Sequence, residues 1–244
     1  MNYADIKTID VQDGDGVRVS IYVSGCHFHC KGCHNKEAWD FNYGKKFEES
    51  TIDYILELLS PSYIAGLSIL GGEPLEIVNQ KGLVPLVKAV KEKYPNKNIW
   101  CYTGYDFEND VLNDMYVKND FTKELIDRID FMVDGEFVES KKIADLKFRG
   151  STNQRKIDVQ ASIKENKIVV LKFGDEARYE NSPIFKEFVL ETKEKEDVQV
   201  SQDIPQIVYE IPEPEQIESG FEYENENIQI AAKNKVDKTK EDLK

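Results

Sequence analysis

The sequence predicts an α/β fold with a mainly parallel sheet, followed by an acidic C-terminal extension. Three observations indicate this: short β-branched runs alternate with segments of helical periodicity, a distinctive turn follows each of several strands, and the composition changes beyond about residue 174. Strands that alternate with helices form βαβ units, and the strands of such units run parallel. We therefore expect a first domain over residues 1–174 and an extension over residues 175–244.

The predicted strands are short and rich in β-branched or aromatic residues. Residues 17–23 alternate apolar and polar side chains after the turn-forming segment 13–16, which is typical of a strand. The remaining strand candidates are residues 67–70, 99–102, 129–133, 157–159 and 168–173.

Three helices are predicted between these strands. Ser50 is the expected N-cap of the first, whose apolar residues between 52 and 59 share one face. The second carries apolar residues at helical spacing from Leu83 to Tyr94, and Pro95 is expected to end it. The third spans about residues 107–117.

Four unusual turns each follow a predicted strand directly. They are Gly25-Cys26, Gly71-Gly72-Glu73, Thr103-Gly104-Tyr105 and Asp134-Gly135. Because the carboxyl ends of parallel strands meet at one edge of a sheet, we expect these turns to converge on a single active site.

The amino-acid composition excludes several classes of function. The 244 residues include 32 Lys and Arg against 46 Asp and Glu, which gives a net charge of −14. Binding to nucleic acid or to an anionic membrane needs clustered basic residues, so neither is expected as a partner. No apolar run approaches the roughly 18 residues that span a bilayer, and residues 1–5 lack the features of a secretion signal. We expect a cytoplasmic protein.

The extension is strongly acidic toward its end. Residues 191–244 contain fifteen Asp or Glu against seven Lys, with three prolines and few aromatic residues. Such a composition favours a largely disordered or loosely appended segment, in which residues 207–209 are a candidate short strand.

Cysteine placement is the most informative feature of the chain. Cys26, Cys30 and Cys33 fall in one short segment that also holds all three histidines, whereas Cys101 lies alone in an apolar strand and is most simply a core residue. Clustered thiols indicate metal or redox chemistry rather than a disulfide framework. Three thiolates at this spacing would ligate three irons of a [4Fe-4S] cluster and leave the fourth iron open. A zinc site completed by a histidine and three unmetallated thiols are the alternatives.

Two further motifs and one single residue, Asp134, each have both a functional and a purely structural interpretation. The glycines of Gly71-Gly72-Glu73 would let the backbone approach a ligand, and Glu73 would face an ammonium group, although a plain strand-to-helix turn explains the same residues. Residues 149–155 carry groups that bind carboxylates, phosphates or nucleobase edges, and a solvated hairpin turn is the simpler interpretation. Asp134 would accept a hydrogen bond from a ribose hydroxyl or begin a turn.

The combination of these motifs resembles the radical S-adenosylmethionine superfamily, and more closely the activating proteins of anaerobic (class III) ribonucleoside-triphosphate reductases. The resemblance covers about residues 1–173 and does not include the acidic extension. The segments that carry it are Gly14-x-Gly16-x-Arg18, Val23-Ser24-Gly25-Cys26, Cys30-Lys31-Gly32-Cys33-His34-Asn35, Gly71-Gly72-Glu73-Pro74, Trp100-x-Tyr102-Thr103-Gly104-Tyr105, Val133-Asp134-Gly135-x-Phe137 and Arg149-Gly150-Ser151-x-Asn153-Gln154-Arg155.

The resemblance implies a partial (β/α) barrel of radical S-adenosylmethionine type and a specific set of site residues. Cys26, Cys30 and Cys33 would ligate the [4Fe-4S] cluster. The residues implied to bind S-adenosyl-L-methionine are Gly32, Cys33, His34, Gly71, Gly72, Glu73 and Asp134. No catalytic side chain beyond the cluster and cofactor is implied.

The same resemblance implies an activity and its partners. An electron from a flavodoxin-like donor would cleave S-adenosylmethionine at the cluster, and the resulting radical would create a glycyl radical on the large subunit of the reductase. Activation of another glycyl-radical enzyme, or another small radical S-adenosylmethionine reaction, is the nearest alternative. A non-catalytic zinc-binding adaptor is the alternative of a different class.

Overall fold

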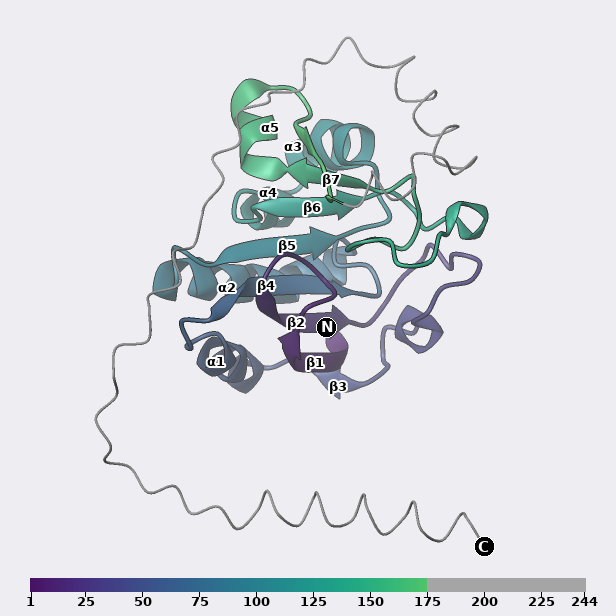
Figure 1. The fold of residues 1–244 in the computed structure, drawn as a ribbon. Helices are drawn as coiled ribbons and strands as arrows, with labels where there is room; N and C mark the ends of the chain where they lie inside the picture. The colour runs from purple at the N-terminus through teal and green to yellow at the C-terminus, as the bar shows by residue number, and fades with distance from the viewer. Residues whose placement is uncertain (175–244) are drawn as a thin grey trace, which may run out of the picture. The chain divides into compact units, whose positions relative to one another are not determined.

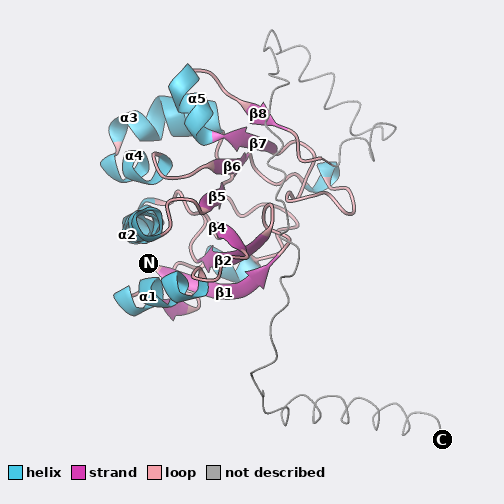
Figure 2. Cartoon of the chain, turned by 60° about the vertical axis from the view of Figure 1, so that its left-hand side comes forward, coloured by secondary structure: helices cyan, strands magenta, loops and turns pink. Residues whose placement is uncertain are grey.

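The computed structural model describes residues 1–174, and these residues form an eight-stranded sheet with helices packed on one face (Figures 1 and 2). The predicted extension 175–244, with its candidate strand 207–209, lies outside the described residues. The strands are β1 (Asn2–Asp10), β2 (Val17–Val23), β3 (Lys45–Lys46), β4 (Ile64–Gly71), β5 (Asn98–Tyr102), β6 (Phe131–Asp134), β7 (Arg155–Asp158) and β8 (Val170–Leu171).

The sheet order is β3-β1-β2-β4-β5-β6-β7-β8, and the sheet is mixed. Strands β2, β4, β5 and β6 pair in parallel, whereas β1, β3, β7 and β8 add antiparallel strands at the two sides. The predicted α/β class is therefore confirmed, but the prediction of a mainly parallel sheet holds only for its centre. The physical reason is the short connection: β1 turns directly into β2, and no α-helix separates β6 from β7.

Within residues 1–174, five α-helices, one π-helix and two 3-10 helices (Lys36–Trp39 and Glu139–Lys141) lie in the connections. The α-helices are α1 (Glu49–Leu58), α2 (Ile77–Lys93), α3 (Tyr116–Lys118), α4 (Asp120–Ile126) and α5 (Val159–Glu165), and the π-helix spans Phe107–Met115. Apolar side chains from β2, β4 and β5 pack against those of α1, α2 and α4 to form the main core. This core holds the parallel strands in place, so that their carboxyl ends share one rim.

Several predicted boundaries need correction. Ser50 is not the N-cap of α1: the cap is Glu48, whose side chain accepts from the Thr51 amide while Thr51 Oγ1 accepts from the Glu48 amide at 3.2 Å. The predicted third helix is mostly a π-helix, and only its last residues continue as α3. Residue 159 begins α5 rather than ending a strand, because the Asp158 carboxylate accepts from the Ala161 amide at 2.9 Å and starts the helix.

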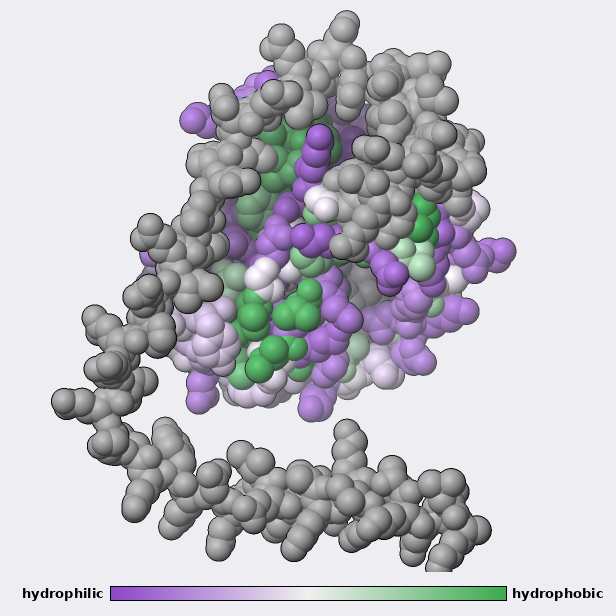
Figure 3. Space-filling model, viewed as in Figure 1, coloured by the Kyte–Doolittle hydropathy of each residue, from purple (hydrophilic) through white to green (hydrophobic). Residues whose placement is uncertain are grey.

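The visible face of the described part mixes polar and apolar residues. Figure 3 shows hydrophilic residues together with apolar patches, one over β1 and β2 and another in the region of α5 and β7. Ile9 and Val11, at the end of β1 and in the turn after it, are 63% and 62% exposed. Within residues 1–174, no helix is long and apolar enough to cross a membrane.

Arg18 fastens the turn between β1 and β2 to the sheet. Its side chain is fully buried and donates five hydrogen bonds. Nε donates to Ser68 Oγ at 2.7 Å, and the two terminal nitrogens donate to the carbonyls of Asp15, Leu67 and Asn98 and to Asn98 Oδ1. Burial lowers the pKa of Arg18 to about 10, so the guanidinium remains charged at neutral pH.

We expect Arg18→Lys to destabilise the protein by about 3 kcal/mol, because an ammonium cannot satisfy acceptors arranged for a planar guanidinium. Urea unfolding of both proteins measures the change. The control is Arg128→Lys, since half-buried Arg128 donates to the Glu124 carbonyl and its replacement should cost less than about 1 kcal/mol. Equal losses for the two variants would contradict the assigned role of Arg18.

Candidate active site

The four predicted turns converge at the carboxyl ends of the parallel strands, as expected. Backbone hydrogen bonds join them: the Gly72 amide donates to the Val23 carbonyl at 2.7 Å, and the Glu73 amide donates to the Gly25 carbonyl at 2.8 Å. On the other side, the Gly135 amide donates to the Tyr105 carbonyl at 3.1 Å. The rim is therefore one continuous hydrogen-bonded structure.

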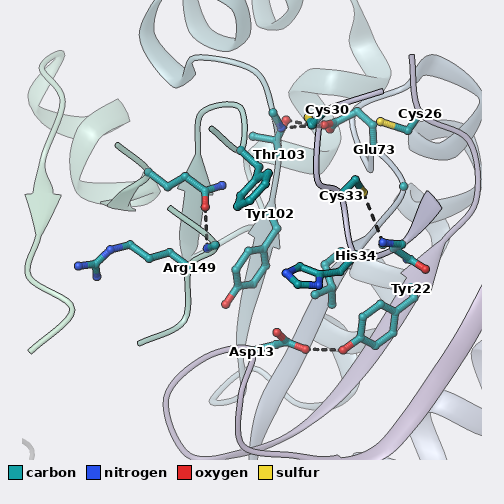
Figure 4. Close-up of a pocket in the computed structure, with 18 of the residues that line it drawn as sticks. Asp13, Tyr22, Cys26, Cys30, Cys33, His34, Glu73, Tyr102, Thr103 and Arg149 are labelled. Atoms are coloured by element: carbon teal, nitrogen blue, oxygen red, sulfur yellow. Dashed lines mark hydrogen bonds between the residues drawn. The ribbon is translucent and has the colours of Figure 1, made fainter. Parts of the chain in front are cut away.

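A cavity of about 630 Å³ opens at this rim (Figure 4). Figure 4 places Cys26, Cys30 and Glu73 at one end and the Asp13–Tyr22 pair at the other, with His34 and Tyr102 between them. The remaining polar and backbone contributors include Gln12, Cys33, Asn35, Gly71, Gly72, Thr103, Gly104, Gly135, Lys147, Arg149, Gly150 and Gln154. The volume suits a nucleoside-sized ligand.

The three clustered cysteines all line this cavity as free thiols. Burial raises the pKa of the Cys26 thiol, and burial together with the neighbouring Glu136 carboxylate raises the pKa of Cys30 to about 11. The Cys33 sulfur accepts a hydrogen bond from the Asn35 amide at 3.4 Å. Cys101 is fully buried in the main core, which confirms its expected place.

The thiols share the cavity, but they are not gathered around one point. Among residues 1–174, no three Cys, His, Asp or Glu side chains form a group that could hold a metal ion as they stand. The histidines of the segment have other contacts: His27 Nδ1 lies 2.8 Å from Glu76 Oε1, and His29 stacks on Trp39. The donor set itself, three thiols and no further cysteine at the cavity, fits an iron–sulfur cluster with three protein ligands.

Glycine is required at Gly25 and Gly72 because the turns touch. A Cβ on Gly72 would lie 2.5 Å from the Gly25 carbonyl oxygen, and a Cβ on Gly25 would lie 2.2 Å from the Phe41 ring. Gly25 also has a φ of +101°, which disfavours other residues. Trp39 and Phe41 thus pack against the cysteine segment, through His29 and His27 respectively.

Glu73 is buried and joins the turn after β4 to the turn after β5. Its carboxylate accepts from the Leu75 amide, the Gly104 amide and Thr103 Oγ1, each at 2.8 Å, and only 2% of the residue is exposed. Burial raises the pKa of Glu73 to about 7, against the lowering effect of these three hydrogen bonds. The carboxylate lines the cavity but is already fully engaged within the protein.

The other predicted cofactor residues take different places. His34 lines the cavity, with Nε2 3.4 Å from Lys142 Nζ, whereas Gly32 packs against Glu139 and is outside the lining. Asp134 is also outside the lining. It is 1% exposed and is paired with Arg155, and its Oδ2 accepts from the Phe107 amide at 2.9 Å. Asp134 therefore has protein partners, and its contact with a ribose stays a prediction.

The polar residues at the far end of the cavity were not predicted from the sequence. Tyr22 donates to Asp13 Oδ2 at 2.5 Å, and burial with the nearby Asp10 carboxylate raises the pKa of Asp13 to about 6. The Tyr102 hydroxyl is buried and has no hydrogen-bond partner among residues 1–174. Residues 13–16 carry a turn signal only, so the sequence held no indication that this turn forms a cavity wall.

Comparison with known proteins defines the class. Residues 12–157, more than half of the chain, match the family described as a 4Fe-4S single cluster domain. This range contains the three cysteines and every strand of the parallel centre. The cavity with its three thiols is thus the candidate cluster site of an iron–sulfur protein.

Three individual proteins that are similar to this chain share a single name. Anaerobic ribonucleoside-triphosphate reductase-activating proteins from Pasteurella multocida and Escherichia coli K12 are each 36% identical to this chain, over 159 and 156 residues. The one from Enterobacteria phage T4 is 37% identical over 155 residues. These alignments cover 63–64% of this chain and 92–96% of the relatives. The chain belongs to the family of anaerobic ribonucleoside-triphosphate reductase-activating proteins.

The raised pKa of Glu73 predicts a pH-dependent stability. Folding shifts its pKa from an ordinary value of 4.5 to about 7, so the folded protein holds this proton more tightly and loses the corresponding stability as pH rises through that range. The neutral variant Glu73→Gln does not have this loss. Its free energy of unfolding, relative to that of the wild type, should therefore be higher at pH 8 than at pH 5.5. Urea unfolding of the metal-free protein at both values measures this, with exposed Glu92→Gln as the control. A pH-independent difference would contradict the assignment.

Proposed function

We propose that this protein activates an anaerobic ribonucleoside-triphosphate reductase by forming a glycyl radical on the reductase large subunit. The observation that carries the proposal is that Cys26, Cys30 and Cys33 line one cavity with the Gly71-Gly72-Glu73 turn. Membership of the activating-protein family supports the choice of target.

The fold that we propose for this activity is a partial (β/α) barrel of radical S-adenosylmethionine type over residues 1–174. The parallel strands β2, β4, β5 and β6, with α1 and α2 on one face, support it. We assign residues 175–244 to a separate acidic extension, on the basis of composition.

In this proposal Cys26, Cys30 and Cys33 would hold a [4Fe-4S] cluster. That cluster would supply the electron for reductive cleavage of bound S-adenosylmethionine, and so the radical chemistry that removes a hydrogen atom from a glycine Cα. The thiols must lose their protons to bind iron, so loading releases protons from groups whose pKa values burial has raised. Gly25 and Gly32 have positive φ at the two ends of the cysteine segment, where glycine allows the backbone to bend.

The remaining cavity residues would orient the cofactor and limit access of water. Gly71 and Gly72 present backbone without side chains, which lets the methionine part of S-adenosylmethionine approach the strand ends closely. Glu73 would lie near the ammonium group, while its hydrogen bonds keep the two turns together. His34 and Cys33 also line the cavity. The chemistry requires no acid–base side chain from the protein.

The proposal includes a partner on each side of the reaction. The large subunit of the reductase supplies the glycine, and a flavodoxin-like protein in the cytoplasm supplies the electron. Activation of a different glycyl-radical enzyme would use the same cavity, and only the choice of target would differ.

The first test is an iron and sulfide assay of the anaerobically reconstituted full-length protein, with electron paramagnetic resonance of the dithionite-reduced sample. We expect about four irons per chain and a signal that changes when S-adenosylmethionine is added, because the cluster keeps one iron without a protein ligand. Addition of the reductase should then give a glycyl radical signal. A colourless, zinc-containing protein would overturn the proposal and favour the zinc-binding adaptor.

Cys30→Ala should abolish cluster binding and reductase activation while the fold is retained, since Cys30 lies outside the core. Iron content, 5′-deoxyadenosine formation and circular dichroism measure these properties. Cys101→Ala is the matched control: it removes a thiol from the core and should lower stability yet retain the cluster. Full activation of the reductase by Cys30→Ala would contradict the assigned ligands.

Truncation near Lys193 should spare S-adenosylmethionine cleavage, because the family match ends at residue 157 and the removed segment is strongly acidic. Comparison of 5′-deoxyadenosine formation by the reconstituted truncated and full-length proteins measures this. If the shortened protein loaded its cluster but made no 5′-deoxyadenosine, the acidic segment would belong to the site.

A further inference from the structure

The connection between β6 and β7 forms a cavity wall that contacts the cysteine segment. Gly135 and Phe137 of this wall line the cavity together with Cys30 and Cys33. Beyond them, Glu139 Oε2 pairs with Lys31 Nζ at 3.1 Å. The wall, defined as residues 135–142, therefore lies directly against residues 31–34 of the cysteine segment.

The next stretch of chain, residues 151–154, is hydrogen-bonded along this wall. Gln154 Nε2 donates to the Gly135 carbonyl at 3.0 Å, and Asn153 Nδ2 donates to the Glu136 carbonyl at 2.9 Å. Ser151 Oγ accepts from the Val138 amide at 3.2 Å. Each of these bonds joins a side chain of residues 151–154 to the main chain of the wall.

Gln154 has the largest share of these contacts. Its Oε1 accepts from the Gly150 amide at 2.8 Å and from the Ser151 amide at 3.2 Å, while Nε2 holds Gly135. Gly135, Gly150 and Gln154 all line the cavity. One carboxamide thus joins two separate segments of the cavity lining.

Burial excludes residues 151 and 152 from a surface for another protein. Ser151 is fully buried and Thr152 is 2% exposed. Arg155 is engaged with Asp134 and with Asp106, at 2.9 Å from the latter. The polar character of this motif is therefore used inside the molecule, which also removes the solvated hairpin interpretation of the sequence.

We propose that residues 151–154 are an internal splint for the cavity wall, and that Gln154 is a positioning residue. It fixes Gly135 and Phe137 at the distance from the cysteine segment that bound S-adenosylmethionine needs. This deepens the proposed function, because the ligand is the one assigned there. Loss of the Gln154 bond to Gly135 should weaken cofactor binding more than it slows cleavage.

The test variant is Gln154→Glu, which preserves the side-chain shape but replaces the donor facing the Gly135 carbonyl with a carboxylate oxygen. The matched control is Gln160→Glu on α5. Gln160 Nε2 donates to the carbonyls of Ile129 and Ile126 at 2.6 and 3.2 Å, and it is not among the cavity residues. Both variants remove an amide donor to main-chain carbonyls.

The reconstituted full-length proteins are compared by the KM and kcat of S-adenosylmethionine cleavage without reductase, and by the resonance signal as the cofactor is titrated. For Gln154→Glu we expect a KM roughly tenfold higher, with kcat within about twofold, and a matching shift in the titration midpoint. Gln160→Glu should lower the melting temperature without changing KM. A KM of Gln154→Glu equal to that of the wild type, or an equal rise of KM in both variants, would contradict the positioning role of Gln154.

Amide hydrogen exchange of the metal-free full-length protein separates this inference from the proposed function. Exchange in Gln154→Glu should rise at residues 135–138 and also at residues 30–34, whether or not S-adenosylmethionine is the ligand. If only residues 135–138 exchanged faster, the coupling to the cysteine segment would be wrong. Asn153→Asp, which removes only the neighbouring bond to Glu136, serves as the milder variant should Gln154→Glu fail to fold.

Discussion

The rim of the sheet depends on one buried carboxylate. Glu73 receives hydrogen bonds from its own turn and from the turn after β5, so the ends of two parallel strands are held at a fixed separation. Since its own backbone amide is bonded to Gly25, the same residue also fixes the start of the cysteine segment. Three parts of the chain that are distant in sequence thus meet at this residue. Burying a carboxylate is unfavourable unless donors surround it, and here three donors do.

Local patterns predicted the centre of the molecule well. Residues 17–23 form β2 with the expected bounds, and α2 ends where Pro95 required it to end. The convergence of the four turns followed from the geometry of parallel strands alone. These features depend on short-range periodicity and on glycine, which a single sequence displays directly.

The edge strands of the sheet, and the hydrogen bonds between residues distant in sequence, could not be predicted from local patterns. Strand β1 has polar and half-exposed residues because it lies near a sheet edge, so its periodicity is weak. The return of β7 antiparallel to β6 depends on a connection without an α-helix, and the partners of Arg18, Asp134 and Gln154 lie far away in the chain. Nothing in the spacing of a motif states which carbonyl a buried side chain will reach.

The two sides of the sheet constrain how other chains can attach. In the described part of the protein the outermost strands, β3 and β8, are two residues long, and β3 consists of Lys45 and Lys46. Strand β3 pairs only with Asn2 and Tyr3, so within residues 1–174 the outer edge of β1 beyond Tyr3 has no strand partner. Free backbone groups along such an edge can pair with an added strand. The outermost ladder is thus short on both sides of the sheet, but on the β1 side a longer strand lies directly behind it.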